Sequence, residues 1–254
     1  MANLSARTLA YINLYAVLGA LENLCEIDPE AKKIASREKP VSVGFEVKDG
    51  PSATLIFGHG KCVLKEGCAD CTIKLPFSSC EKFNGLIDGT VTPIPRKGFL
   101  HLGFLLKDFV KLTDLLSHYL KAEPEELEDA DFKKKSTILM FYVIVSALSQ
   151  IGNEDSIGRF SASNIVDGVI QLSVKNGPCA GIRVRNHHME TVKRRPKNPR
   201  ALMEFGSMEL ARDLFDGKVN SVACVGTGDI RMGGMISMVD NVNRILDRVS
   251  LYLA

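Results

Sequence analysis

Long hydrophobic runs are missing from this chain of 254 residues. The longest unbroken apolar stretch, Ile138 to Val145, is far shorter than the ~20 residues that a helix needs to cross a bilayer. The amino-terminal stretch Met1 to Arg7 lacks the basic region and the cleavage site of a secretory signal peptide. The sequence therefore predicts a protein without a membrane span that resides in the cytoplasm.

Signatures of catalysis and of metal binding are also missing. The chain contains no Gly-x-Ser-x-Gly, His-Glu-x-x-His or P-loop sequence. Cys68-x-x-Cys71, with Cys62 and Cys80 nearby, has thiols at a spacing that zinc accepts, but Cys71 falls on an alternating strand that would bury it. All seven cysteines, an odd number, are interpreted as free thiols. We predict that the chain is not an enzyme and has no catalytic residues, cofactor or metal.

A strong excess of charge of one sign is absent too. Lys and Arg total 32 against 30 for Asp and Glu, so the net charge is +2, and hydrophobic residues make up 45% of the chain. This balance is typical of a soluble globular protein whose partners are not selected by overall charge. Nucleic acid is therefore not an expected partner.

The chain does contain an internal repeat. The sequence Val47-Lys48-Asp49-Gly50-Pro51 returns as Val174-Lys175-Asn176-Gly177-Pro178, and 174 minus 47 gives a spacing of 127 residues. Asp-Gly-Pro and Asn-Gly-Pro are turn sequences, because Gly tolerates positive φ, Asp and Asn bond to their own backbone, and Pro lacks an N–H. We expect each copy to end a strand.

The flanking sequences repeat at nearly the same spacing. Tyr15 to Leu21 matches Tyr142 to Leu148, and the apolar steps of the last helix in each half match at a spacing of 133. Such a period predicts two homologous domains in tandem. Their predicted limits are residues 1–121 and 136–254, joined by an acidic linker over residues 122–135 that is interpreted as solvated.

Each half is predicted to be α+β, with a long apolar helix, strands, a short helix and a closing helix. In the first half we expect helices at 8–24, 79–87 and 101–120 and an antiparallel meander of strands at 42–48, 53–57, 61–65 and 71–75. In the second half we expect helices at 137–151, 208–215 and 238–253 and strands at 169–175, 181–186, 200–205, 221–225 and 229–232.

Short motifs of the second half resemble those of a known family. They are Phe205-Gly206-Ser207 before Met208-Glu209-Leu210, the step Asp216-Gly217-Lys218-Val219, and the segment from Gly228 to Gly234. The order of elements and these motifs are similar to the sterol carrier protein type two family, in two tandem copies. The resemblance implies, for each half, a mainly antiparallel sheet of about five strands with helices on one face and an apolar tunnel between them for lipids.

The first half departs from the family pattern. Residues 90–95, Thr-Val-Thr-Pro-Ile-Pro, stand where the family has a regular strand, and Pro93 and Pro95 cannot donate to a ladder. The pocket of the first half is therefore in doubt, and any ligand is expected in the second half.

Methionine is concentrated in the second half, where seven of the eight residues lie from Met140 onward. Met is unbranched and adapts to an irregular ligand, so these residues could line a lipid pocket, and the alternative is a core padded by Met without a ligand. The predicted ligand-binding residues are Met203, Phe205, Met208, Met232, Met235, Met238 and Tyr142.

A basic segment runs from Arg183 to Arg200 and includes one acid, Glu190. Arg194, Arg195 and Lys197 are predicted to contact an anionic surface such as a membrane, and the alternative is a solvated hairpin that protrudes at its prolines.

The predicted function is non-catalytic binding or transfer of a lipid or another hydrophobic small molecule. The alternative is a pseudo-dimeric interaction module whose two cores are filled by their own side chains. The sequence leaves the oligomeric state open between a pseudo-dimeric monomer and a homodimer.

Overall fold

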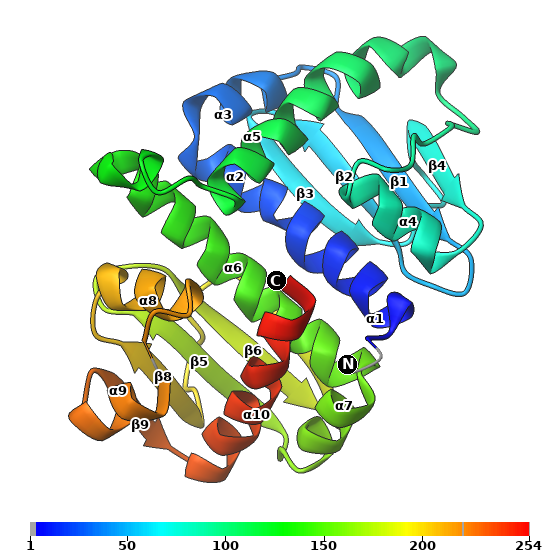
Figure 1. Cartoon of the computed structure of the whole chain (residues 1–254). Helices are drawn as coiled ribbons and strands as arrows, with labels where there is room; N and C mark the ends of the chain where they lie inside the picture. The colour runs from blue at the N-terminus through cyan, green and yellow to red at the C-terminus, as the bar shows by residue number, and fades with distance from the viewer. Residues whose placement is uncertain (1–3, 220, 254) are drawn as a thin grey trace. The chain divides into compact units, whose positions relative to one another are not determined.

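A computed structural model describes residues 4–219 and 221–253 of the chain (Figure 1). The chain divides into two compact units, Met1–Leu127 and Glu128–Ala254, and each has its own sheet with helices packed on it. The α+β class expected from the sequence is confirmed. The predicted limits 1–121 and 136–254 stay a prediction, and their outer ends, residues 1 and 254, lie outside the described residues.

The first unit begins with a continuous helical run and ends with another. The amino-terminal run comprises α1 (Ala6–Tyr11), the π-helical η1 (Ile12–Val17), η2 (Leu18–Ala20) and α2 (Leu21–Ile27). It is followed by α3 (Pro29–Ala35), β1 (Val41–Val47), β2 (Ser52–Gly58), β3 (Lys61–Glu66), β4 (Ile73–Phe77) and α4 (Cys80–Ile87). The closing run comprises η3 (Phe99–His101), η4 (Phe104–Phe109) and α5 (Val110–Leu120), and η5 (Glu126–Glu128) follows.

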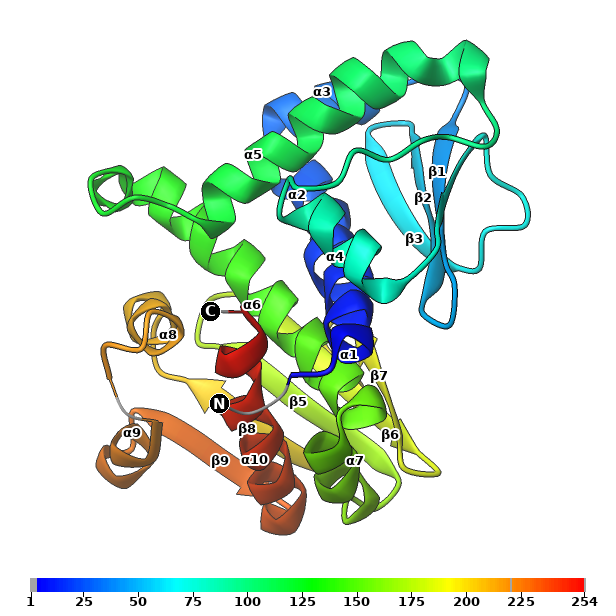
Figure 2. The same ribbon diagram turned by 45° about the vertical axis from the view of Figure 1, so that its right-hand side comes forward.

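The first sheet has the order β3-β2-β1-β4, and in Figure 2 its helices lie to one side of it. The predicted meander is wrong at its last step, because β4 pairs in parallel with β1. The segment between β3 and β4 crosses the outer face of the sheet at Gly44, where a Cβ would lie 2.6 Å from the sulfur of Cys71. Gly44 in β1 therefore makes room for the segment that crosses from β3 to β4. The sequence around Gly67 is typical of a turn and does not distinguish a tight hairpin from this crossing.

The second unit repeats this order of elements and adds two. It comprises α6 (Ala130–Glu154), α7 (Ser156–Ser163), β5 (Gly168–Val174), β6 (Cys179–Arg185), β7 (His188–Val192), β8 (Ala201–Phe205), α8 (Met208–Phe215), α9 (Ser221–Thr227), β9 (Ile230–Gly234) and α10 (Ile236–Leu253). Its sheet has the order β7-β6-β5-β8-β9, with β5 and β8 parallel and the other pairs antiparallel. Strands β1 and β5, β2 and β6, and β3 and β7 begin 127 residues apart, as the repeat predicts.

The fifth strand distinguishes the two sheets. Strand β9 pairs with β8 over its full length, whereas the first unit has a single bridge between Lys74 and Lys97 at the same edge. The prediction that Pro93 and Pro95 prevent a regular strand there is confirmed for the described residues.

The strand predicted at 221–225 is wrong, because these residues belong to the helix α9. Val222 and Val225 favour a strand locally, yet β9 already occupies the edge of the sheet beside β8. The edge beside β8 is therefore already paired, and the helix ends before Gly228, which has φ 81°. The sequence pattern also missed the short helices α3 and α7.

The repeated turn has the same conformation in both units. Asp49 and Asn176 both have φ 57°, and each turn closes with a hydrogen bond from the glycine N–H to the valine carbonyl, Gly50 to Val47 and Gly177 to Val174. The prediction that each copy ends a strand is confirmed, since the turns follow β1 and β5 directly.

Helix α6 is long and apolar enough to span a membrane by length and composition. However, 67% of its most apolar 18-residue window is buried, as in the core helix of a soluble protein. It packs on β6 and β7, where Gly152 leaves room for the side chain of Met189. The side chain of Asn153 exchanges two hydrogen bonds, of 2.8 and 2.9 Å, with the backbone of Met189. All seven cysteines of the chain are free, as predicted.

A buried aspartate anchors the closing helix of each unit. In the first unit, Asp28 accepts hydrogen bonds from the backbone of Glu30 and Ala31 at the start of α3, and the Tyr119 hydroxyl of α5 donates to it at 2.9 Å. The carboxylate thus joins the start of one helix to the end of another, across 91 positions of sequence.

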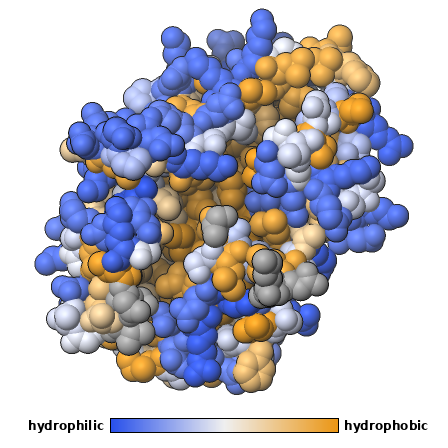
Figure 3. Space-filling view, in the orientation of Figure 1, coloured by the Kyte–Doolittle hydropathy of each residue, from blue (hydrophilic) through white to orange (hydrophobic). Residues whose placement is uncertain are grey.

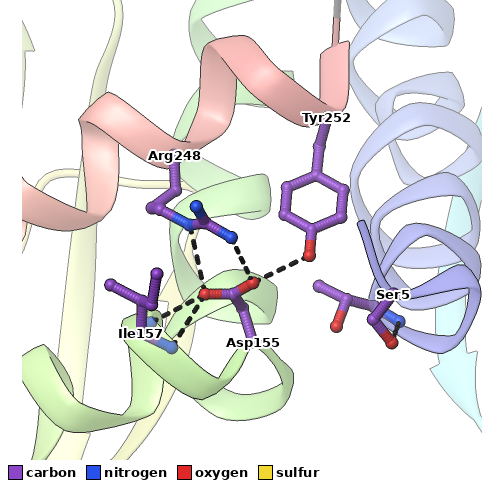
Figure 4. Close-up of polar contacts among 7 residues, drawn as sticks. Ser5, Asp155, Ile157, Arg248 and Tyr252 are labelled. Carbon is purple, nitrogen blue, oxygen red and sulfur yellow. Dashed lines mark hydrogen bonds and ion pairs between the residues drawn. The ribbon is translucent and has the colours of Figure 1, made fainter. Parts of the chain in front are cut away.

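The second unit has the same arrangement and adds an arginine (Figure 4). Asp155 caps α7 through the N–H groups of Ile157 and Gly158, and it accepts from the Tyr252 hydroxyl at 2.8 Å. Arg248 of α10 donates to both carboxylate oxygens, at 3.2 and 2.8 Å. Burial alone would raise the pKa of Asp155, but the donors from Arg248, Gly158 and Tyr252 outweigh it, and the pKa lies below its usual value.

We expect Asp155→Asn to cost about 3 kcal/mol of unfolding free energy at neutral pH, because it leaves Arg248, whose side chain is only 15% exposed, without its counter-charge. Asp28→Asn keeps an oxygen that can accept the two capping N–H groups and alters only the contact with the Tyr119 hydroxyl, so we expect at most about 1 kcal/mol. Urea denaturation of the full chain followed by circular dichroism measures both, and equal costs would contradict the role of Arg248.

The same pair predicts a dependence on pH. Because the folded pKa of Asp155 is depressed, its contribution is complete above the unfolded value of about 3.9 and is lost as the pH falls through the lower folded value. The stability difference between the wild type and Asp155→Asn is therefore expected to narrow in acid.

Candidate functional site

Aromatic rings fill the interior of the first unit. Phe45 contacts Phe83 with ring centroids 6.0 Å apart, and Phe77 contacts Phe83 at 5.2 Å. Phe57 contacts rings of the closing run, Phe104 at 5.5 Å and Phe109 at 6.0 Å. All of these side chains are buried. The rings connect the sheet, α4 and the closing run into one packed layer.

Smaller residues take most of these places in the second unit. At the spacings of the repeat (127 in the first three strands, 128 from β4 through α4, 133 in the closing run), five of the six rings are replaced. The replacements for Phe45, Phe57, Phe83, Phe104 and Phe109 are Leu172, Val184, Ala211, Ser237 and Val242, and Phe77 is kept as Phe205. At these five positions the second unit therefore has less side-chain volume than the first.

Three of the predicted ligand-binding residues come together on β8 and β9. Met203 lies directly opposite Met232, and Phe205 lies opposite Ile230. Met203 and Phe205 are buried, whereas Met232 is half-buried. Residues opposite one another on antiparallel strands share a face of the sheet, so these side chains form one apolar surface.

Two further methionines lie where β9 leads into α10. Met238 is fully buried in the first turn of α10, and its side chain extends toward Gly168 at the start of β5. Met235 lies between the two elements, is 36% exposed, and its N–H donates to the carbonyl of Arg200 at 2.9 Å. The first belongs to the apolar layer and the second lies at its rim.

Met208 and Tyr142 come from other places in the unit. Met208 begins α8 and approaches the turn after β5, where a Cβ on Gly177 would lie 2.8 Å from its sulfur. Tyr142 is half-buried on α6 and its ring contacts that of Phe141. The structure therefore groups Met203, Phe205, Met232 and Met238 most closely, with Met208 at the end of the sheet and Tyr142 on the helix that covers β6 and β7.

Sequence reasoning missed the apolar residues of α8 and α9 that adjoin this layer. Leu210, Leu214, Phe215 and Val225 are each half-buried, and the ring of Phe215 contacts Phe205 with centroids 6.2 Å apart. In Figure 3 hydrophobic atoms lie in a recess between α8 and α10. Aligning the two halves and comparing residue sizes would have pointed to this region, because Phe83 of α4 becomes Ala211 of α8.

A hollow of about 750 Å³ lies in the first unit. Most of its lining is polar, and it includes Lys33, Arg37, His101, Asp108 and Lys111. Ion pairs of Arg37 with Asp108 and of Lys111 with Glu30 cross this region. Its charged lining differs from the apolar tunnel that the resemblance implies.

Residues 193–200 of the basic segment join β7 to β8 and contact the sheet at Gly181. Pro196 packs on Gly181 of β6, so the segment is held against the sheet at this proline, where the sequence suggested a protruding loop. Arg195 acts on the thiol of Cys179: burial raises the pKa of this cysteine, and the arginine opposes that effect. Arg194, Arg195 and Lys197 are exposed.

No protein-family model matches the chain, and no curated protein matches it. Solved structures are similar to it. The sterol carrier protein domain 2 of Helicoverpa armigera is 16% identical over 44% of this chain and 88% of its own, with a TM-score of 0.36. The apo form of sterol carrier protein 2 from Yarrowia lipolytica is 17% identical over 42% of this chain and 88% of its own, with a TM-score of 0.32.

A stereoselective inverting sec-alkylsulfatase from Pseudomonas sp. is 10% identical over 57% of this chain and 28% of its own, with a TM-score of 0.25. Sterol carrier protein domains are thus among the solved structures similar to this chain, as the sequence motifs predict. This similarity defines neither a ligand nor an activity, so the proposed function is based on the residues of the chain itself.

The burial of the methionines predicts different costs of removing them. We expect Met238→Ala to cost about 3 kcal/mol of unfolding free energy, because it leaves a cavity beneath α10. Met232→Ala should cost less than about 1 kcal/mol, since its side chain is only half-buried. Denaturant titration measures both, and equal large costs would favour a uniformly packed core over an adaptable layer.

Proposed function

We propose that the second unit binds a lipid or another hydrophobic molecule, without catalysis, in the apolar layer between its sheet and its helices, and that the protein works in the cytoplasm. The observation that carries this proposal is the loss of five phenylalanine rings between the first unit and the second. The closing helix and the sheet persist while the side chains between them shrink. An apolar ligand would occupy the volume that the rings fill in the first unit.

The residues of this layer suit such a ligand energetically. Each methylene of an acyl chain transferred from water contributes roughly 0.8 kcal/mol, so binding needs no specific polar partner. Met203, Met232 and Met238 line the layer, and their unbranched side chains can adapt to chains of different shape. The half-buried Leu210, Leu214 and Val225 would gain burial on binding.

We infer that the two units arose by internal duplication and then diverged in role. Equivalent polar contacts support this inference: Glu22 accepts from the Leu64 N–H in the first unit, and Ser149 bonds to Thr191 in the second, 127 residues on at both positions. Because aromatic rings fill its core, the first unit would act as a support or an interaction module. The second unit would bind the ligand.

Extraction of the native protein and a substitution that adds a ring to the second unit test the proposal. Native protein extracted with organic solvent should yield a lipid in stoichiometric amount by mass spectrometry. Ala211→Phe restores the ring that Phe83 provides in the first unit, so we expect it to reduce the bound lipid severalfold because ligand and ring compete for the same volume.

Phe83→Leu is the matched control, because it alters the unit that is not the proposed site and should leave the lipid content unchanged. Repeated absence of lipid from the wild type, with Ala211→Phe as stable as the wild type, would reject ligand binding. That outcome would favour the second candidate, an interaction module with filled cores, for which the packed rings of the first unit are the supporting observation.

The exposed basic segment supports a further proposal, contact with anionic membranes. Each Lys or Arg near such a surface contributes about 1 kcal/mol. Reversal of two charges, Arg194→Glu with Arg195→Glu, should therefore weaken binding to anionic vesicles by more than about tenfold in sedimentation assays. Unchanged binding would remove this segment from the membrane contact.

A further inference from the structure

Bulky apolar side chains are exposed together where the closing run of the first unit begins. In Figure 3 hydrophobic atoms gather at the upper right, over the beginning of this run. Leu100 is 98% exposed, and four more exposed apolar side chains lie within ten residues of it in the sequence. The exposed fractions are 79% for Ile94, 64% for Phe99, 66% for Leu106 and 43% for Val110. We refer to residues 94–110 as the apolar tip.

The apolar tip is fastened to the sheet. The Arg96 N–H donates to the Lys74 carbonyl at 2.8 Å, and the Lys74 N–H donates to the Lys97 carbonyl at 3.2 Å. Gly98, with φ 95°, lies so close to β4 that a Cβ there would be 2.8 Å from the Cα of Ile73. The chain then makes the single turn η3, whose first two residues are Phe99 and Leu100. These side chains therefore point outward from an anchored base.

Exposed positive charges lie in the same segment as the exposed apolar side chains. Residues 94–110 contain three cations, Arg96, Lys97 and Lys107, and one carboxylate, Asp108, so with neutral His101 their sum is +2. All three cations are exposed, and Asp108 is engaged in an ion pair with Arg37. An exposed apolar group with cations close to it in the chain matches the interface of an anionic bilayer, where the side chains enter the acyl region and the charges meet lipid headgroups.

We propose that the apolar tip docks the first unit on an anionic lipid surface. The same charges argue against a second copy of the chain as the occupant, because a symmetric contact would place the +2 patch against itself. The corresponding place in the second unit, Met235 and Ile236 after Gly234, differs in charge: the nearest cation in sequence, Arg231, is paired with Glu204. This inference does not depend on the proposed ligand of the second unit.

A single fluorophore reports on the contact directly. The chain contains no Trp, so Phe99→Trp in the full-length protein gives one indole at the apolar tip. We expect its emission to shift to the blue with vesicles of phosphatidylcholine mixed with phosphatidylglycerol, to be quenched by lipids brominated on the acyl chain, and to change little with phosphatidylcholine alone. High salt should weaken the response, because it screens the cations.

A charge variant tests the same surface by sedimentation with the mixed vesicles. Leu100→Glu should lower the affinity at least about tenfold, since a carboxylate replaces an inserted leucine. Val63→Glu is the matched control: Val63 is also exposed in the first unit, at 42%, but lies on the edge strand β3, and its variant should bind as the wild type does. Both sites are at the surface, so the fold should tolerate both changes.

Several outcomes would overturn the proposal. They are an indole emission that ignores anionic vesicles, an equal loss of binding in Leu100→Glu and Val63→Glu, and an indole already shielded from water without lipid. The last result would assign the apolar tip to a contact within the chain or, if light scattering shows a dimer that Leu100→Glu dissociates, to a second copy.

Discussion

A buried carboxylate at the start of a short helix fixes the closing helix of each unit. Asp28 and Asp155 cap α3 and α7, and each also accepts a tyrosine hydroxyl from the closing helix. A charge removed from water is stable only when donors surround it, so these contacts form as a set. The closing helix forms one wall of the interior, and its position decides where Phe109 of one unit and Met238 of the other lie.

With this frame held constant, the interior is free to diverge. The interior of the first unit contains six phenylalanine rings in mutual contact, and its sheet has four strands. The second unit keeps one of these rings, adds β9, and relies on methionine and small aliphatic residues. It also reinforces its carboxylate with Arg248, at a position where the first unit has Leu115. The unit with fewer interior rings thus has an additional ion pair that holds its closing helix.

The edge of the sheet diverges as well, with consequences at the surface. Prolines replace the fifth strand in the first unit, and one backbone bridge, Lys74 to Lys97, remains to hold the chain. The residues beyond that bridge form the exposed apolar tip. In the second unit the same edge carries β9, and the chain passes into α10 with fewer exposed apolar residues. The proposed ligand therefore belongs to the interior of one unit, and the proposed lipid contact belongs to the surface of the other.

Local chemistry made much of this predictable. The turn at Asp49 and its copy at Asn176, the helix Met208–Phe215 after the cap of Ser207, and the missing strand at Pro93 follow from residues adjacent in sequence. The repeat also predicts two units, as the structure has them, and the methionines are the basis on which the second half is proposed to have an adaptable interior. For the candidate site, the pairing of Met203 with Met232 agrees with the predicted grouping, whereas Tyr142 lies on a different element.

Tertiary structure alone decided the rest. The parallel pairing of β1 with β4 depends on a crossing at Gly44, and α9 is a helix beside β9, which pairs with β8. The bonds of Tyr119 to Asp28 and of Tyr252 to Asp155 join residues 91 and 97 positions apart. Periodicity and turn chemistry act over a few residues, so they determine the elements and the repeat, while strand order, buried ion pairs and the filling of the interior depend on contacts that exist only once the chain has folded.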